Sequence, residues 1–363
     1  LRVCTSLPCL LRGSGDVLDQ IKKRLKISPG QTTPGQEVTL TEVECLCACE
    51  MSPMAQLDER FVGPIDTSGV ATLIQDALDE PTSAESTPEP DPYICFDGPV
   101  LSTRFKDPDG TWFEGYVADG GYTASRKVLT SMTAGEVIDT ISKANLRGLG
   151  GAGFPASRKW SFIPKDSTQP KYLVVNADEG EPGTFKDRYI MERDPHALLE
   201  GMIIAAYAIG SHKAYVYIRG EYFRSAKRLQ RAIDEAYNSN WLGRDIQGSG
   251  FDLDVVIHRG AGAYICGEET ALLTSLEGGK GFPKIKPPFP AISGLFKCPT
   301  IVNNVETLAC VPFILRNGPE RFAEIGSDTQ GGTRLFCVSG HVVRPGVYEQ
   351  SVSITLRELI EQH

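Results

Sequence analysis

The sequence predicts an α/β protein with a small N-terminal domain and a larger C-terminal domain. From about residue 96 onward, candidate strands alternate with candidate helices, a pattern typical of an α/β domain. Before that point, residues 80–92 are rich in proline and acidic residues and cannot build a core. We therefore expect a first domain at 1–80, a linker at 81–95 and a second domain from 96 onward.

The first domain is expected to contain few, short elements. Hydrophobic periodicity and turn residues predict them in this order: the end of a strand at Leu1–Cys4, a loop at Cys4–Cys9, an amphipathic helix at Val17–Leu25, a strand at Glu37–Glu42, a second short sheet edge, and a helix at Val70–Leu78. This β-α-β-β-α order suits a small thioredoxin-like domain.

Five of the ten cysteines fall in the first fifty residues: Cys4, Cys9, Cys45, Cys47 and Cys49. Ten unevenly spread cysteines do not fit a secreted disulfide scaffold, so the concentration indicates a metal site in a reducing compartment. Four thiolates from two loops can hold a [2Fe–2S] cluster, and a four-cysteine zinc site accepts similar spacings. Spacing alone leaves both open. It also does not select ligands among the last three cysteines, which share one face of an extended segment.

The second domain shows alternating strand and helix patterns. The expected strands are Lys171–Asn176, Lys213–Ile218, Leu253–His258 and Thr333–Ser339. The expected helices include Ala197–Ile209, Phe223–Asn238, Glu268–Leu276 and Asn304–Leu315. The longest apolar run, Met202–Ile209, is too short to span a bilayer and is expected to be a buried helix.

A glycine-rich stretch, Arg147–Trp160, begins with a G-x-G-x-x-G pattern. Such backbone can approach a flat or phosphorylated ligand closely. The pattern does not fit a Rossmann dinucleotide fingerprint, which follows a strand and opens a helix. Here a helix with Thr133 as its cap is predicted before the glycines, and the strand comes after them. An ordinary Rossmann dehydrogenase is therefore disfavoured.

Two further glycine loops, Asn176–Gly183 and Gly260–Glu269, indicate one nucleotide pocket built from several segments. A helix opening at Gly267 can direct its N-terminus at a phosphate or a flavin edge, although the acids that follow also simply complement the helix dipole. Cations that could neutralise an anionic ligand lie beside these loops: Lys159, Lys186, Arg188, Lys284 and Lys286.

The charge balance excludes some partners. With 37 basic and 46 acidic residues, the net charge of −9 argues against nucleic acid or an anionic membrane as the main partner. No secretory signal is recognisable, and a cytoplasmic protein without direct membrane insertion is expected. Four further cysteines lack paired spacing and are expected to be buried small hydrophobes: Cys266, Cys298, Cys310 and Cys337.

Long motifs also carry a family resemblance. Residues 1–80 resemble the small thioredoxin-like [2Fe–2S] subunit of NADH:quinone oxidoreductase (respiratory complex I) through Cys4-x4-Cys9 and Val43–Cys49. Residues from about 100 onward resemble its large flavoprotein subunit, which binds FMN and NADH. That match runs through Arg147–Trp160, Asn176–Arg188, Gly260–Leu272 and Ile301–Thr307.

The fusion of both parts in one chain is similar to the diaphorase subunit of soluble NAD-linked complexes. These are the β subunit of NAD-dependent formate dehydrogenases and the flavin subunit of NAD-reducing hydrogenases. The hydrogenase branch often lacks a full cysteine set in the front domain, so the complete set here favours formate dehydrogenase. The resemblance implies hydride transfer between NAD(H) and FMN, then single electrons to iron–sulfur clusters, with a cofactor that carries the chemistry. The implied partner is a catalytic large subunit with further clusters.

The resemblance also assigns residues. A non-Rossmann FMN site is implied at Gly148, Gly150, Gly151, Lys159, Asn176, Asp178, Gly267, Glu268, Asn303, Asn304 and Thr307. Positions around NAD(H) are Phe154, Phe162, Glu181, Tyr264, Glu269, Lys286 and Phe289, with Glu181 and Glu269 as the catalytic candidates. The implied [2Fe–2S] ligands are Cys4, Cys9, Cys45 and Cys49, without Cys47. Taken singly, Phe154, Phe162 and Phe289 also fit core positions and Lys286 a solvated charge, whereas a tyrosine inside a glycine loop, Tyr264, fits a core less well.

Two departures from the family pattern stand out. Leu149 occupies a position where the family usually has arginine, so a guanidinium near the phosphates is missing or supplied elsewhere. No C-x2-C follows Cys49, so the family's [4Fe–4S] cluster is expected only in a longer chain. The FMN- and NAD-binding domain is expected to cover 96–328, and 329–363 to begin a β-grasp-like domain.

Overall fold

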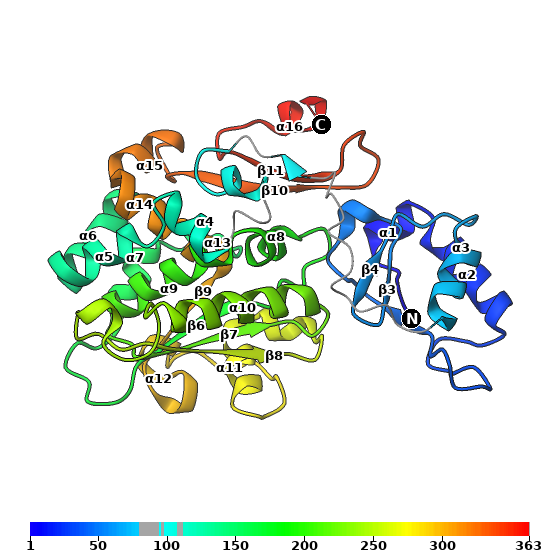
Figure 1. The fold of residues 1–363 in the computed structure, drawn as a ribbon, viewed down its shortest axis with the longest axis horizontal. Helices are drawn as coiled ribbons and strands as arrows, with labels where there is room; N and C mark the ends of the chain where they lie inside the picture. The colour runs from blue at the N-terminus through cyan, green and yellow to red at the C-terminus, as the bar shows by residue number, and fades with distance from the viewer. Residues whose placement is uncertain (80–93, 96–97, 107–111, 363) are drawn as a thin grey trace.

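The computed structural model describes residues 1–79, 94–95, 98–106 and 112–362. Three sheets organise them. A small N-terminal domain stands beside a larger α/β body, and a third, short sheet lies over one side of that body (Figure 1). The α/β prediction is confirmed. The expected linker at 81–95 lies outside the described residues except for Ile94 and Cys95, which form strand β5.

The N-terminal domain contains a four-stranded sheet in the order β2-β1-β3-β4. Strand β2 is parallel to β1, and β3 and β4 add antiparallel. The elements are β1 (Arg2–Cys4), α1 (Leu7–Leu11), α2 (Ser14–Leu25), β2 (Thr41–Val43), the 3₁₀ turn η1 (Cys49–Met51), β3 (Ala55–Leu57), β4 (Arg60–Val62) and α3 (Val70–Leu78). The expected helices at Val17–Leu25 and Val70–Leu78 are confirmed.

Two expectations for this domain were wrong. The segment from Cys4 to Cys9 is not all loop, because α1 begins at Leu7 with a proline in its first turn, where the missing N–H costs nothing. The strand expected at Glu37–Glu42 is found at Thr41–Val43. The earlier residues form a turn instead, in which the Thr33 side chain accepts the N–H groups of Glu37 and Val38.

The body is built on a parallel sheet in the order β8-β7-β6-β9. Its strands are β6 (Tyr172–Ala177), β7 (Lys213–Ile218), β8 (Asp254–Arg259) and β9 (Thr300–Asn304). Alternate residues of β6 enter two different cores: Leu173 and Val175 pack on the side of α9 (Pro195–Ile209), and Val174 packs with Leu272 of α11 (Glu269–Leu276). Both faces are therefore covered, which explains the continuous apolar strands.

Helices surround this sheet. Besides α9 and α11 they are α4 (Phe113–Ala118), α5 (Thr123–Ser131), α6 (Ala134–Lys143), α7 (Ala156–Ser161), α8 (Lys186–Arg193), α10 (Phe223–Asn238), α12 (Pro290–Ser293), α13 (Val305–Ala309), α14 (Val311–Asn317) and α15 (Pro319–Ile325). Short 3₁₀ turns are η2 (Ser102–Lys106), η3 (Ile246–Gly248), η4 (Tyr264–Gly267) and η5 (Leu295–Lys297). Thr133 and Glu136 form a capping box at the start of α6, which confirms the helix before the glycine stretch.

The prediction of one helix at Asn304–Leu315 was wrong. The segment divides into α13 and α14 at Cys310, two residues before Pro312, whose ring cannot continue the preceding helix. Strand β9 was not predicted either. Its five residues end in two asparagines, and their strand conformation depends on pairing with β6.

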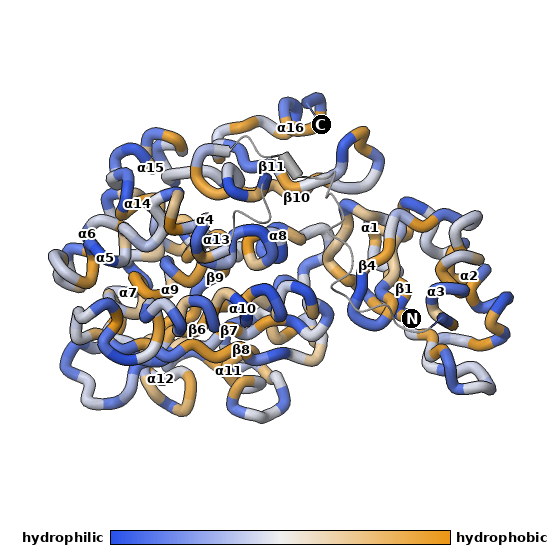
Figure 2. The backbone as a smooth tube through the Cα atoms, in the orientation of Figure 1, coloured by the Kyte–Doolittle hydropathy of each residue, from blue (hydrophilic) through white to orange (hydrophobic). Residues whose placement is uncertain are grey.

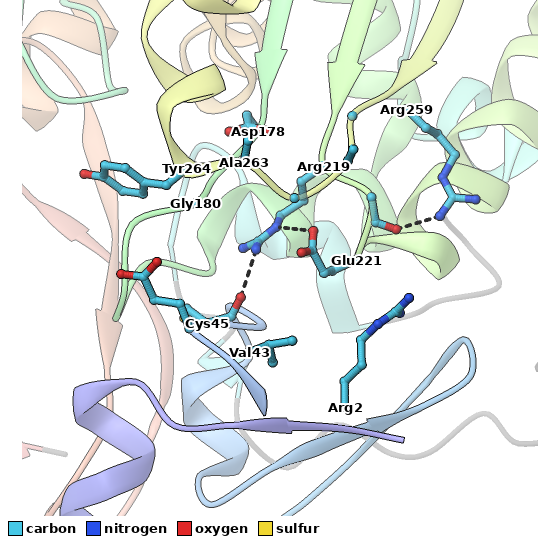
Figure 3. A pocket seen from close by; sticks show the side chains of 15 residues that line it. Arg2, Val43, Cys45, Asp178, Gly180, Arg219, Glu221, Arg259, Ala263 and Tyr264 are labelled. Carbon is cyan, nitrogen blue, oxygen red and sulfur yellow. Dashed lines mark hydrogen bonds and ion pairs between the residues drawn. The ribbon is translucent and has the colours of Figure 1, made fainter. Parts of the chain in front are cut away.

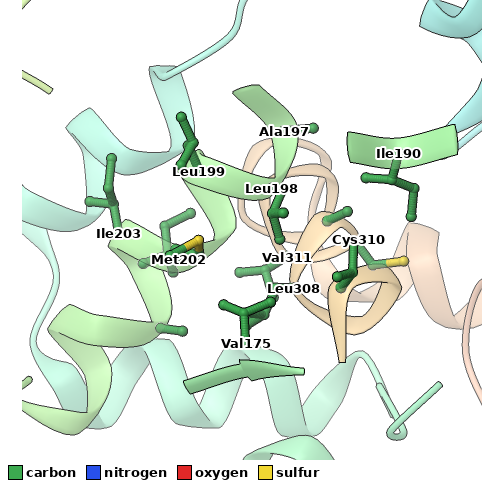
Figure 4. Close-up of a cluster of buried hydrophobic side chains, with 14 of the residues drawn as sticks. Val175, Ile190, Ala197, Leu198, Leu199, Met202, Ile203, Leu308, Cys310 and Val311 are labelled. Carbon is green, nitrogen blue, oxygen red and sulfur yellow. The ribbon is translucent and has the colours of Figure 1, made fainter. Parts of the chain in front are cut away.

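Helix α9 forms the centre of the core (Figure 4). Leu198 and Met202 are fully buried with Leu308 and Val311, so the predicted burial of the apolar run is confirmed. A side chain at Gly201 would lie 2.0 Å from the Leu308 carbonyl oxygen, so glycine allows α9 and α13 to approach. No helix in the part of the chain that the structure describes is long and apolar enough to cross a membrane.

Helix α8 is polar yet buried. It is coloured as hydrophilic in Figure 2, although every residue from Asp187 to Arg193 is buried. Arg188 forms an ion pair with Glu50 of the N-terminal domain, and the Tyr189 hydroxyl donates to the same carboxylate at 2.9 Å. The helix therefore contributes paired charges to the junction of the two domains.

The third sheet has the order β10-β11-β5, with β10 (Thr333–Val338), β11 (Gly346–Ser351) and α16 (Leu356–Gln362). The Glu349 carboxylate of β11 accepts the backbone N–H groups of Val100, Leu101 and Ser102. The boundary expected at residue 329 stays a prediction. Of the four unpaired cysteines, Cys266 and Cys310 are buried as expected, whereas Cys298 and Cys337 are partly exposed.

Candidate functional site

A cavity of about 580 Å³ opens at the carboxyl ends of β6 and β9, the edge where parallel sheets place their ligands. All three glycine loops contribute to its wall. Predicted residues that line it are Gly150, Gly151, Asn176, Glu181, Tyr264, Gly267, Glu268 and Asn304. A smaller cavity of about 150 Å³ shares part of this wall and adds Gly148, Phe154, Lys159, Glu269 and Asn303.

The first glycine loop forms a close-fitting wall. A side chain at Gly150 would meet the Cβ of Asn304 at 3.0 Å, and Gly151 has a φ of 134°, in the region that disfavours other residues. Thr307 is fully buried and accepts the Leu149 N–H at 2.8 Å. Among the described residues, no acceptor pairs with the N–H groups of Gly150 or Gly151. These groups are therefore available to an anionic or polar ligand.

Asparagines at the strand ends tie the loops together. Asn176 donates to the Gly267 carbonyl oxygen at 2.9 Å. Asn304 caps α13, where its side-chain oxygen accepts the Glu306 N–H at 3.0 Å. Asn303 accepts the Trp160 indole N–H at 2.9 Å. The cavity wall is held in shape by these bonds before any ligand enters.

The start of α11 carries a row of paired charges. Glu268 caps the helix by accepting two backbone N–H groups. Lys286 lies 3.1 Å from Glu268 and 2.7 Å from Glu269, and Lys159 lies 3.0 Å from Glu269. Burial alone would raise the pKa of Glu269, but Lys159 and Lys286 hold it below its usual value. The carboxylates are thus ionised.

The other cations expected to meet an anionic ligand are also paired. Lys186 bridges Asp187 and Glu306, Arg188 pairs with Glu50, and Lys284 pairs with Glu277.

The cation not foreseen is Arg334, at the start of β10. It lines the larger cavity beside Leu149, and in the described part of the chain no carboxylate pairs with it, only the Gln330 side-chain oxygen. No sequence signal marked it, because it belongs to a different sheet.

Two adjacent carboxyl groups have strongly raised pKa values. Burial raises the pKa of Asp178 to about 7, although Arg219 opposes the shift. Burial also raises the pKa of Glu179 to about 7, with Asp187 adding to the effect. Glu179 was not predicted; it lines the larger cavity and accepts the N–H groups of Asp187 and Arg188. Asp178 faces a separate cavity described below.

The aromatic candidates are partly exposed, and two of them, Phe154 and Tyr264, line a cavity. Phe154 and Phe162 are half exposed, with ring centroids 6.0 Å apart. Tyr264 donates to the Glu181 carboxylate across the larger cavity. Phe289 is 57% exposed before α12 and lines none of the three cavities described here. These rings offer flat surfaces to a ligand instead of filling the core.

The predicted cysteine ligands gather at the edge of the N-terminal domain that faces the body. Cys4 ends β1, Cys9 lies in α1, Cys45 precedes η1 and Cys49 begins it, and all four are buried. Contact with Cys45 raises the pKa of Cys4 and of Cys49, whereas contact with Cys4 lowers the pKa of Cys45. Buried thiols that compete for the same protons are a donor set suited to metal, because metal binding replaces the protons.

The arrangement of these thiols bears on the choice of metal. Among the described residues, no three Cys, His, Asp or Glu side chains surround a point that would hold a single metal ion. Zinc requires its sulfurs about 2.3 Å from one ion. A two-iron cluster divides four thiolates between two metals and fits a more extended set. Four buried thiols from two loops supply the ligand number that a [2Fe–2S] cluster requires.

Cys47 lies between Cys45 and the body. It is fully buried, and its sulfur lies 3.5 Å from the Cys45 sulfur, 3.7 Å from the Glu181 carbonyl oxygen and 2.7 Å from an Arg219 nitrogen. Beside it, a third cavity of about 520 Å³ is lined by both domains, with Arg2 and Cys45 on one side and Asp178, Arg219 and Arg259 on the other (Figure 3).

Two family models match the parts of the chain that contain these two sites. Residues 1–78 match the family model of the thioredoxin-like [2Fe–2S] ferredoxin, and residues 141–313 match that of the Nuo51 FMN-binding domain. Two successive parts of the chain are thus similar to a thioredoxin-like [2Fe–2S] domain and to an FMN-binding domain of the Nuo51 type. The second match contains all three glycine loops, so the expected non-Rossmann flavin site is favoured over the Rossmann alternative. The first match favours iron over zinc at the cysteines.

The chain is also similar to F subunits of NADH-quinone oxidoreductases. The chain is 57% identical over 265 residues to the F 2 subunit of the NADH-quinone oxidoreductase of Rhizobium meliloti (strain 1021), covering 73% of this chain and 63% of the relative. It is 53% identical over 270 residues to the F subunit of the NADH-quinone oxidoreductase of Mycobacterium tuberculosis (strain ATCC 25618 / H37Rv), covering 72% and 60%. The chain thus spans less than two thirds of these relatives.

A solved structure covers both domains together. NAD+-reducing [NiFe]-hydrogenase in the air-oxidized state matches 99% of this chain with a TM-score of 0.84 and 31% identity, over 60% of the matched chain. The folds of both parts of this chain therefore occur together in one chain of that solved structure.

Proposed function

We propose that the chain is a diaphorase subunit that exchanges a hydride between NAD(H) and FMN and passes single electrons to iron–sulfur clusters. One arrangement supports this proposal. A glycine-walled cavity lies beside a domain with four buried cysteines, and the Cys47 sulfur contacts the backbone oxygen of Glu181 in the cavity wall. When bound, FMN supplies the conversion between two-electron and one-electron chemistry.

The chain's own residues hold the flavin. The N–H groups of Gly150 and Gly151 face the cavity, Asn176 and Asn304 fix its edges, and Lys159 adds positive charge. The proposed flavin-binding set is Gly148, Gly150, Gly151, Lys159, Asn176, Asp178, Gly267, Glu268, Asn303, Asn304 and Thr307. Two of these line neither the larger nor the smaller cavity of the flavin site: Asp178 lines the neighbouring cavity between the domains, and Thr307 supports the glycine wall through the Leu149 N–H. Arg334 joins this set as the guanidinium for the phosphate, a role that Leu149 cannot fill.

The nicotinamide side is proposed to lie toward the cavity mouth. Phe154 and Phe162 present flat faces to the dinucleotide, and Tyr264 with Glu181 borders the path to the flavin. Glu181 and Glu269 orient the nicotinamide against the flavin; neither needs to move a proton. The full set is Phe154, Phe162, Glu181, Tyr264, Glu269, Lys286 and Phe289.

The front cluster is proposed to be bound by Cys4, Cys9, Cys45 and Cys49. In the complete complex the electrons go to a catalytic large subunit with further clusters, and we propose a cytoplasmic formate dehydrogenase because all four cysteines are present. The second candidate partner is a hydrogenase, which the 99% coverage of this chain by the hydrogenase structure favours. Respiratory complex I is the third.

Two measurements test these proposals separately. The holoprotein mixed with NADH without oxygen should lose its oxidised flavin absorbance and reduce a small artificial acceptor; retention of the absorbance would contradict the diaphorase assignment. The copurifying large subunit is then supplied with formate or hydrogen. NAD+ reduction with formate supports formate dehydrogenase, and reduction only with hydrogen contradicts it and supports the hydrogenase.

A further inference from the structure

Arg219 reaches from the body into the cysteine loop of the other domain. It follows β7 directly and is 5% exposed. One terminal nitrogen donates to the Cys47 sulfur at 2.7 Å and to the Glu179 carbonyl oxygen at 3.1 Å; the other donates to the Cys45 carbonyl oxygen at 2.8 Å. Figure 3 shows the side chain between Glu221 and Cys45.

The positive charge is directed at the cysteines. The Nε atom donates to Glu221 at 3.1 Å, so this carboxylate occupies one edge of the guanidinium, while both terminal nitrogens face the cysteine loop. A second cation among the described residues near the cysteines, the buried Arg188, is matched by Glu50, which directly follows Cys49. Arg219 therefore contributes positive potential at the loop, and burial strengthens it because water screens it little.

We propose that Arg219 raises the reduction potential of the [2Fe–2S] cluster by stabilising the negative charge that the cluster gains on reduction. The inference rests on the proposed cysteine ligands. Reduction would add one electron to the cluster, the reduced flavin would supply it, and no bond between heavy atoms would form or break. Arg219 touches a ligand's backbone and the neighbouring thiol, so it is a positioning and charge-supplying residue, and the potential is its direct readout.

The test is a redox titration of the holoprotein, with the reduced cluster followed by EPR. In Arg219→Gln the equilibrium constant for reduction should fall about tenfold, a shift of about 59 mV to lower potential for one electron. Arg219→Lys should retain most of the potential, because it keeps the charge. Glu221→Gln should shift the potential upward, because it removes the opposing carboxylate.

The matched control is Arg259→Gln. Arg259 lines the same cavity but donates to the Gly220 carbonyl oxygen and stacks on Phe223, without contact to the cysteine loop. The midpoint potential of the cluster in Arg259→Gln should equal that of the unmodified protein. An assembled cluster in Arg219→Gln with an unchanged midpoint would overturn the inference. If Arg219→Gln does not assemble the cluster, the midpoint potential of Glu221→Gln is the test. An unchanged or lower midpoint potential in Glu221→Gln would also overturn the inference. Absence of a [2Fe–2S] signal in the unmodified protein would instead refute the proposed ligands, and the inference with them.

Discussion

The flavin cavity and the cysteine site lie side by side but are built in opposite ways. The cavity has backbone walls, and its side chains already have partners, as Asn176 has with Gly267 and Asn303 with Trp160. The cysteine site consists of buried thiols whose main contacts are with one another, as Cys45 has with Cys4 and Cys49.

This difference predicts how each site depends on its cofactor. A cavity whose wall is satisfied by its own hydrogen bonds can lose its ligand and keep its shape. Thiols that are buried together need a metal to replace their protons, so metal binding contributes directly to folding. Loss of the cluster should therefore disturb the protein more than loss of the flavin.

The largest expected effect is that of Cys45→Ser. Cys45 contacts the thiols of Cys4 and Cys49, so its loss should abolish the [2Fe–2S] EPR signal and lower the melting temperature, while bound flavin stays near one per chain. Cys47→Ser is the matched control and should keep the cluster, since Cys47 faces Arg219. Signal loss in Cys47→Ser with retention in Cys45→Ser would reverse the ligand assignment.

Next in size is a pH effect at Asp178, which lines the cavity between the two sites. Its pKa of about 7 in the folded chain exceeds the unfolded value of about 3.9. Between these values the folded state holds the extra proton, so the free energy of unfolding should fall as pH rises from about 4 to 7, by up to roughly 4 kcal/mol.

Denaturant unfolding at pH 5 and pH 8 checks this. Asp178→Asn should reduce the loss of stability between the two pH values, and the exposed Asp139→Asn should not. Glu179, whose pKa is also about 7, will maintain part of the pH dependence in the variant. Equal slopes in Asp178→Asn and the unmodified protein would show that burial does not raise the pKa of Asp178.

A smaller effect tests whether the cavity relies on charge from the third sheet. Arg334→Gln should weaken FMN binding about tenfold, roughly 1.4 kcal/mol, because it removes the cavity's guanidinium. Arg344→Gln, an exposed arginine of the same C-terminal region, is the control. Fluorescence titration of each flavin-free protein measures its dissociation constant for FMN. Equal dissociation constants for the two variants would exclude Arg334 from the phosphate site.

The smallest effect concerns the cavity mouth. Glu181→Gln should raise the KM for NADH about threefold, because a charge-assisted hydrogen bond with Tyr264 becomes a neutral one, while flavin content stays constant. Glu277→Gln, whose carboxylate pairs with Lys284, is the control. Loss of flavin in Glu181→Gln with full turnover per remaining flavin would place Glu181 on the flavin side.

The sequence by itself determined the elements whose signals are local. The capping box at Thr133, the long amphipathic pattern of α10 (Phe223–Asn238) and the apolar runs of β6 and β7 are set by residues within a few positions of one another. The glycine loops and the cysteine spacing were equally readable, because backbone freedom and thiol chemistry belong to residue types.

Only the tertiary structure decided which charges are available and which short segments become strands. The basic residues beside the glycine loops proved to be paired, whereas Arg334 and Arg219 reach the two sites from β10 and from the end of β7. Strand β9 exists because β6 pairs with it. Each of these depends on partners far away in the chain, and local propensity carries no information about such partners.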